Sequence, residues 1–346
     1  MTSRPQVDIS VSSVFRALLP VVLLVLLYLL SDVLVIVLFA IVIASAVNPF
    51  VAWFEARRVP RMVAVLILYV MVAALIVLLS SLIVPSVSRD IAQLSSVIPR
   101  FAESVSTSLD EVQNGTSRYF DFVGEVQNIL EIISGYLQQF SQSALSLLAG
   151  AFGGVFTFIA VMVLSFYFSV MRKGVESFLQ AVVPERYEPY ILNLWKRSEV
   201  KMGLWLQGQL LLALVVGLLV YVGLELLGVR FALILAIIAM SLELIPIAGP
   251  VIAAIPGIGL ALVQDPGLAI WVFLLYLGVQ QLENHVLTPL IMGKTTGLNP
   301  VVVILAILIG GNLAGIPGAL LGVPVATVIV EVLDDIARAK TSRKAA

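Results

Sequence analysis

Two acidic side chains, Glu243 and Glu283, lie within long apolar stretches of the 346-residue chain. Carboxyl groups can exchange protons or bind cations, and an ionisable group at membrane depth is costly enough that it usually faces an aqueous path. Glu243 stands three residues before Pro246, where a helix would break. We therefore interpret both glutamates as candidates for proton or cation coupling. A position at the headgroup level near a helix end is the alternative for Glu283.

Neutral amide side chains accompany these glutamates and could hydrogen-bond a polar solute. Gln280 precedes Glu283 by three residues and follows Tyr276 by four, a spacing that places all three on one helical face. The Pro and Gly residues beside these groups would expose backbone to the same solute. The complete set of candidate solute-pathway residues is Gln207, Gln209, Glu243, Pro246, Gly249, Pro250, Gln280, Gln281, Glu283, Asn284, Asn312 and Pro317.

Helix-breaking residues concentrate in the same region. Residues 231–324 hold 8 of the 16 Pro and 12 of the 24 Gly of the chain. Proline removes a helical hydrogen bond and leaves backbone groups without intrahelical partners. Lipid cannot satisfy those groups, so broken backbone at membrane depth must be buried in protein or line a watery cavity. This is the usual position of the solute site in a transporter, and we predict a solute-sized chamber here.

The breaks divide two apolar blocks, 231–263 and 299–330, that resemble each other. The letters of residues 234–237 recur at 304–307, and each copy is followed by a Gly/Pro break. We favour two re-entrant or arched hairpins of opposite orientation, since this arrangement puts Asp265 outside and Lys294 inside. In the alternative, each block crosses the membrane once, and these two residues exchange sides.

The amino-acid composition indicates the kind of fold that positions these candidate pathway residues. Charged residues make up only 12% of the chain, about half the usual quarter, whereas hydrophobic residues reach 60% and the mean hydropathy is +1.09. We predict an all-α integral membrane protein with about six to eight membrane helices. The net charge of −1 gives no footprint for nucleic acid. No Cys and a single His exclude a zinc-finger or iron–sulfur framework, and we find no catalytic motif, so we expect neither an enzyme nor a cofactor.

The chain divides into six parts by hydropathy and charge. We expect membrane spans in 1–85, amphipathic extramembrane helices in 86–145, a span in 146–171, an amphipathic linker in 172–201, a transport core in 202–336 and a basic tail in 337–346. Within the first part we predict spans at about 14–30 and 33–53 joined by a turn at Asp32, or else one bent helix, followed by a span at 62–84.

Charge asymmetry sets the expected orientation. The short loop 55–61 carries Arg57, Arg58 and Arg61, and the tail carries four further basic residues, so both should be cytoplasmic by the positive-inside rule. Segment 86–145 is acidic, with seven acids against three Arg, and should lie on the other side. We therefore expect both termini in the cytoplasm.

Several motifs resemble those of the autoinducer-2 exporter family of bacterial membrane proteins. The resemblance is carried by residues 243–250 (ELIPIAGP), 280–289 (QQLENHVLTP), 292–294 (MGK), 297–300 (GLNP) and 322–324 (GVP). Asn48-Pro49, Trp53, Pro60-Arg61 and Pro85 also resemble that family, so the likeness covers nearly the whole chain. It implies a bacterial inner-membrane homo-oligomer, expected to be a pentamer, that exports a small polar solute of the autoinducer-2 type. Some members are linked instead to sodium (lithium)/proton exchange.

Three functions follow for comparison. The first is export of a small, neutral, polar molecule through a cavity at the Pro/Gly breaks, with protons as the coupling ion. The second is a cation/proton antiporter in which Glu243 and Glu283 exchange Na⁺ or Li⁺ for protons. The third is a membrane scaffold that transports nothing and binds a partner through segment 86–145. The expected partners are membrane lipid, the solute, protons or Na⁺, and further copies of the chain.

Overall fold

The computed structural model describes residues 29–79, 154–171, 173–292 and 298–345, together with positions 18, 22, 25, 26, 81 and 85. The predicted amphipathic segment 86–145 and residues 146–153 lie outside these ranges. The described residues form helices and no strands. This architecture confirms the predicted all-α class.

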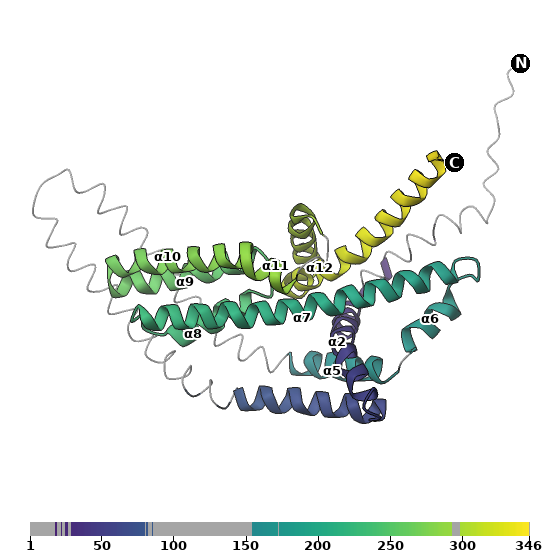
Figure 1. Ribbon diagram of the computed structural model, residues 1–346, viewed down its shortest axis with the longest axis horizontal. Helices are drawn as coiled ribbons and strands as arrows, with labels where there is room; N and C mark the ends of the chain where they lie inside the picture. Colours follow the sequence, from purple (N-terminus) through teal and green to yellow (C-terminus); the bar gives the residue numbers. More distant parts are fainter. Residues whose placement is uncertain are drawn as a thin grey trace, which may run out of the picture.

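The helices surround one long central helix (Figure 1). Their bounds are α2 (Ser31–Glu55), an unlabelled helix (Arg61–Leu79), α5 (Val155–Val170), α6 (Gly174–Val182), α7 (Glu188–Leu226), α8 (Ala232–Leu242), α9 (Ala248–Gln264), α10 (Pro266–Leu282), η1 (Glu283–Leu287), α11 (Thr288–Ile291) and α12 (Pro300–Ala345). Within the described part, four are long and apolar enough to cross a membrane by length and composition alone: α2, the helix Arg61–Leu79, α7 and α12, the last of which has a break at Ala314–Gly315. The bent pair α5 and α6, with 85° between its helices, would make a fifth span.

The helix α7 is longer than the sequence predicts. The linker 172–201 contains α6, but from Glu188 onward it is already the first part of α7, which continues without a break to Leu226. Its one proline, Pro189, lies in the first turn, where proline is tolerated, and the helix packs against α2, α8, α10 and α12. At 1.5 Å per residue its 39 residues are roughly 58 Å long. This helix therefore connects the N-terminal spans to the broken helices.

The first apolar block, 231–263, folds back on itself as a hairpin of α8 and α9. The two helices pack together, and the loops at their outer ends are joined by Gln264. Its side-chain amide donates to the carbonyl of Gly228 at 2.8 Å and accepts from the N–H of Arg230 at 3.0 Å. The 11 residues of α8 span roughly 17 Å, less than the ~30 Å hydrocarbon core. We call this unit the first hairpin.

The second block, 299–330, also folds back, within the helix α12. Its backbone leaves helical geometry at Ala314 and at Gly315, whose φ of 61° and ψ of −144° suit glycine alone. The two limbs approach backbone to backbone, because a Cβ on Gly310 would collide with the carbonyl of Gly318 and one on Gly322 with that of Ala306. We call this unit the second hairpin.

The two hairpins begin at opposite ends of the membrane part of α7. The open end of the first hairpin lies beside Gly228, directly after α7, whereas the returning limb of the second reaches Glu331, which pairs with Lys201. The 26 residues from Lys201 to Leu226 correspond to roughly 39 Å of helix. The predicted pair of interrupted hairpins is therefore present.

Candidate functional site

The tip of the first hairpin is a strained turn. Ile247 has a φ of 69° and a ψ of −51°, and the N–H of Ala248 donates to the carbonyl of Pro246 at 2.8 Å. This is a γ-turn of the rare form, which a β-branched residue adopts only when the surrounding structure forces it. Backbone strain of this kind occurs mostly at functional sites.

A close backbone contact holds the tip shut. Gly249 lies directly against the carbonyl of Leu242, so that any Cβ at this position would overlap the carbonyl oxygen. The hairpin can thus close only with glycine at 249. The same contact brings the end of α8 beside the start of α9, which positions Glu243 between the two helices.

Glu243 is fully buried at this tip. Its backbone carbonyl accepts a hydrogen bond from the side-chain amide of Gln209 on α7, which satisfies one group released by the helix end. Both of its carboxyl oxygens, however, are buried without a hydrogen-bond partner. None of the described cationic side chains forms an ion pair with it. A buried polar group in this state requires an explanation, since nearly all such groups are hydrogen-bonded.

A second buried carboxyl, that of Glu283, comes from the next helix. It begins the π-helix η1, a rare form that is frequent at functional sites. Glu283 and Glu243 line the same small cavity, so the two carboxyls are neighbours. Two neighbouring carboxylates cannot both ionise easily in a buried site, and one shared proton would replace their repulsion with a hydrogen bond. The pair is therefore suited to holding and releasing a proton.

The two carboxyls line a very small cavity between α7, α8, α9 and α10. Its volume of about 10 Å³ is close to the minimum for one water molecule. Val216 and Val220 form the α7 wall, and Tyr276 contributes a buried hydroxyl that also lacks a partner. A cavity of this size accommodates a water or a single small cation. The predicted solute-sized chamber has no counterpart here in this conformation.

Among the remaining predicted pathway residues, some lie beside the pair. Pro250 and Gln280 line the same cavity. The amide of Gln280 lies 3.4 Å from an oxygen of Glu283 and 3.4 Å from that of Asn284, at the limit of a hydrogen bond. Asn284 itself is exposed, as is Gln281.

Other predicted residues lie elsewhere. The amide of Gln207 donates to the carbonyl of Ala46 at 2.6 Å and so joins α7 to α2. Asn312 and Pro317 flank the tip of the second hairpin, are exposed, and line neither this cavity nor the larger one described below. Their part in a solute path stays a prediction.

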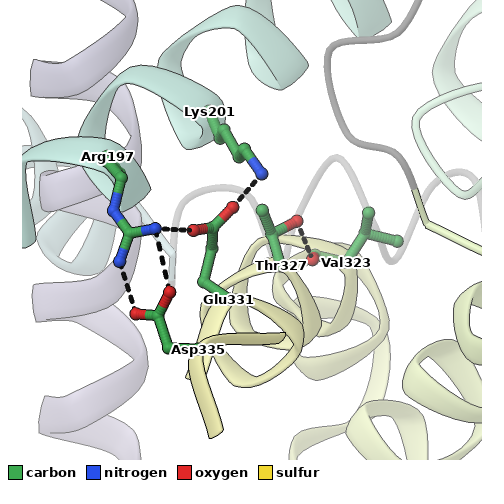
Figure 2. A network of polar contacts seen from close by, with 6 residues as sticks. All are labelled: Arg197, Lys201, Val323, Thr327, Glu331 and Asp335. Carbon is green, nitrogen blue, oxygen red and sulfur yellow. Dashed lines mark hydrogen bonds and ion pairs between the residues drawn. The ribbon is translucent and has the colours of Figure 1, made fainter. Parts of the chain in front are cut away.

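A cluster of ion pairs at the base of the second hairpin was not predicted. Arg197 on α7 pairs with Glu331 at 2.9 Å and with Asp335 at 2.5 Å, and Lys201 also pairs with Glu331 (Figure 2). The nearby hydroxyl of Thr327 donates to the carbonyl of Val323 at 2.9 Å. We call these four charged residues the α7–α12 cluster. Its signal in the sequence is a pair of bases four apart and a pair of acids four apart, which form matching stripes on two helices.

These features define a class of protein. Helices that are long and apolar, together with interrupted hairpins that begin at opposite ends of a central span and carry buried carboxyls, are typical of multi-pass membrane transporters. The chain belongs to the AI-2E family of transporters, which it matches over residues 18–338. This membership confirms the resemblance found in the sequence motifs.

Relatives with known names support the same class. The chain is 28% identical over 305 residues to the AI-2 transport protein TqsA of Escherichia coli strain K12, covering 87% of this chain and 85% of TqsA. It is 27% identical over 292 residues to YueF of Bacillus subtilis, covering 82% and 78% of the two chains. YhhT of Escherichia coli strain K12 is 29% identical over 299 residues, covering 86% and 83%. YueF and YhhT are named as candidate transport proteins.

Proposed function

We propose that this protein exports a small, neutral, polar molecule of the autoinducer-2 type across a bacterial inner membrane, driven by protons that bind the Glu243–Glu283 pair. The observation that carries the coupling is the buried carboxyl of Glu243, whose two oxygens have no hydrogen-bond donor, beside the second buried carboxyl of Glu283 in the same cavity. The family supports transport, and the name of TqsA supports the solute.

The chemistry of the pair suits a coupling step. With one proton shared between them, the two carboxyls carry a single negative charge. In this state the pair can remain between the apolar walls of α7 and α9. Loss of that proton leaves two buried like charges, which favours an opening of the hairpin that admits water. Protonation would thus select between a closed and an open hairpin tip, and Gln280 and Pro250 would then meet the solute.

A homo-oligomer is part of this proposal. Asn312 is exposed on an apolar hairpin, where lipid cannot hydrogen-bond its amide. A neighbouring copy of the chain could supply the missing partner. We expect the purified protein to have the mass of an oligomer, and we expect Asn312→Leu to weaken that association as measured by native mass spectrometry.

Flux measured in liposomes tests the transport proposal. Purified protein should move autoinducer-2 faster when a proton gradient is imposed. Glu243→Gln, which keeps the shape but cannot ionise, should remove the acceleration by the gradient and lower flux towards that of empty liposomes. The matched control is Glu225→Gln, an exposed glutamate near the end of α7, which should leave flux unchanged. Equal gradient dependence in both variants would refute coupling at the pair.

Cation/proton exchange is the second candidate, and the size of the cavity favours it. A space of about 10 Å³ beside two carboxyls fits a small cation better than an organic solute. In the same liposomes, proton movement that requires Na⁺ or Li⁺ and proceeds without autoinducer-2 would establish exchange. Both candidates predict loss of coupling in Glu243→Gln, so the solute dependence decides between them.

A further inference from the structure

A second, much larger cavity lies towards the other end of α7. It occupies about 380 Å³ between α2, α5, α6 and the N-terminal part of α7. Small-molecule sites commonly have volumes of about 300–1,000 Å³, so this cavity is large enough for a small organic ligand. Asn48, Pro49 and Arg61, which carry part of the family resemblance, all line it.

The polar side chains that line this cavity form a hydrogen-bonded network across several helices. The amide of Asn48 donates to Glu199 on α7 at 3.2 Å, and its oxygen accepts from Arg61 at 3.0 Å. Arg61 also donates to the carbonyl of Ser169 on α5 at 2.8 Å and to Glu55 at 3.3 Å. One arginine and one asparagine thus connect four helices: α2, the helix Arg61–Leu79, α5 and α7.

This network determines which ligands the cavity can accept. The guanidinium of Arg61 uses Nε and both terminal nitrogens within the protein, and Glu55 balances its charge. An anion such as a phosphate would therefore find no uncommitted guanidinium. The lining also contains Lys196, but its three carboxylates, those of Glu55, Glu176 and Glu199, outnumber its two cations. The described residues also contain no group of three or more acidic or His side chains that could hold a metal ion.

What the cavity offers is hydrogen bonding beside an aromatic wall. Glu199 accepts from Asn48 through one oxygen, so its other oxygen can accept from a ligand hydroxyl. Asn48 has a second amide hydrogen to donate. Trp195 and Phe168 line the same space. Carboxylate and amide groups beside an aromatic ring suit a compact molecule with several hydroxyl groups, whose O–H groups donate and accept while its C–H face packs on the ring.

We propose that this cavity is a second binding site, for a small neutral polyhydroxy molecule. Its identification with the exported solute rests on the proposed function. The site then takes up the solute on the side of the membrane where α7 begins, before the solute reaches the carboxyl pair.

Close packing of α7 against α2 separates the two cavities, so the two sites are distinct. A Cβ on Gly203 would collide with the carbonyl of Ser45, which shows that α7 lies directly against α2 at this level. Gln207 adds its hydrogen bond to Ala46 one turn further on. Leu204 and Val216, the nearest α7 residues of the two linings, are 12 residues apart, or roughly 18 Å of helix. A solute held in the larger cavity therefore does not touch Glu243.

The test fills the larger cavity without disturbing its network. Ala52 is exposed, lines the cavity and lies one helical turn beyond Asn48. Ala52→Phe should weaken binding of autoinducer-2 and of D-ribose to the purified protein by about tenfold or more, measured by titration calorimetry in nanodiscs. The matched control is Ala56→Phe, one turn further along and outside the lining, which should bind both probes as the wild type does.

A spectroscopic signal locates the ligand independently of the filling variant. Bound probe should quench the fluorescence of Trp195, and Trp195→Phe should remove that quenching while Trp271→Phe, an exposed tryptophan on α10, should retain it. If Ala52→Phe does not fold, this comparison decides alone.

The outcomes separate the two proposals. Autoinducer-2 flux with an unchanged KM in Ala52→Phe, or binding without a Trp195 signal, would overturn the second site and leave the exporter intact. Binding of ribose that Ala52→Phe weakens, in a protein that does not move autoinducer-2, would support the cavity and reject the exporter. If neither probe binds to the wild type, the second site is wrong.

Discussion

The two cavities along α7 differ most in how their polar groups are satisfied. The larger one, with a volume of about 380 Å³, has its arginine and asparagine hydrogen-bonded across four helices. The smaller one, about 10 Å³, contains a carboxyl with both oxygens unpaired and a tyrosine hydroxyl in the same state. The larger cavity is thus an open space lined by hydrogen-bonded polar groups, whereas the smaller cavity is nearly closed and contains polar groups without hydrogen-bond partners.

This difference favours different roles for the two cavities, selective binding for the larger one and a change of conformation for the smaller one. A satisfied network fixes the shape of a site and so favours selective binding, because its groups need no rearrangement when a ligand arrives. An unsatisfied buried carboxyl is unstable where it is, and any change of protonation alters the relative stability of the conformations that bury or expose it. In the functions that we propose, the first region would recognise the solute and the second would switch between conformations.

The largest expected effect comes from preventing closure of the small cavity. Gly249→Val places a branched side chain against the carbonyl of Leu242 and should destabilise the folded protein by about 3 kcal/mol. Thermal unfolding in detergent should show a lower midpoint, and liposome flux should be lost. Gly278→Ala on α10 is the control, since a Cβ there meets nothing within 4 Å. Normal flux in Gly249→Val would mean that the hairpin tip does not need to close.

The next effect distinguishes the satisfied network. Asn48→Leu leaves Glu199 and Arg61 each without one hydrogen bond and should lower the free energy of unfolding by about 2 kcal/mol. The measurement is chemical denaturation in detergent. Asn193→Leu, at an exposed position on α7, serves as the control and should change stability little. An unaltered stability in Asn48→Leu would show that the network holds nothing in place.

The small cavity should respond to a polar substitution with the opposite sign. Glu243→Gln removes a buried ionisable group that has no partner, so the free energy of unfolding should rise by about 1 kcal/mol even as coupled flux is lost. Denaturation of this variant beside Asn48→Leu gives the comparison in one experiment. A loss of stability in both variants would remove the distinction between the two regions.

The smallest effect concerns the tyrosine. Tyr276→Phe deletes a hydroxyl that has no hydrogen-bond partner, so stability should stay within about 0.5 kcal/mol of the wild type or rise slightly. Flux should keep its response to the proton gradient. A large loss of stability would instead indicate that the hydroxyl holds an ordered water molecule beside Glu243.

The broken hairpins could be predicted from the sequence because their signals are local. Pro246 and Gly315 lie at the two observed breaks, whereas Pro250 lies in the first turn of α9, where proline is tolerated. The long apolar stretches indicate a membrane by composition alone. Glu243 was found for the same reason, as an ionisable residue beside such a break. The helix α7 exceeded its prediction, because its first part is amphipathic and carries charge, which resembles a linker when only hydropathy is considered.

The larger cavity and the α7–α12 cluster could not be predicted in this way. Asn48 and Glu199 are 151 residues apart, and Arg197 and Asp335 are 138 apart, so no local spacing connects them. The sequence indicated Asn48 only through the family resemblance, and Arg61 only through that resemblance and the positive charge of its loop, with no role for either in a cavity. The π-helix at Glu283 was also missed, although it places this carboxyl beside Glu243, because a single wide turn leaves no mark in residue types.

The length of α7 has a mechanical consequence. At roughly 58 Å it exceeds the hydrocarbon thickness of ~30 Å, so we expect its charged N-terminal portion to extend beyond the bilayer. Arg197 and Lys201 connect this outer portion to α12 through ion pairs. Further along the same helix, Gln209 and Val216 lie beside the buried Glu243. In the transport cycle that we propose, a tilt of the outer portion of α7 would therefore move the wall of the cavity that holds Glu243 and Glu283, without any change in the helix itself.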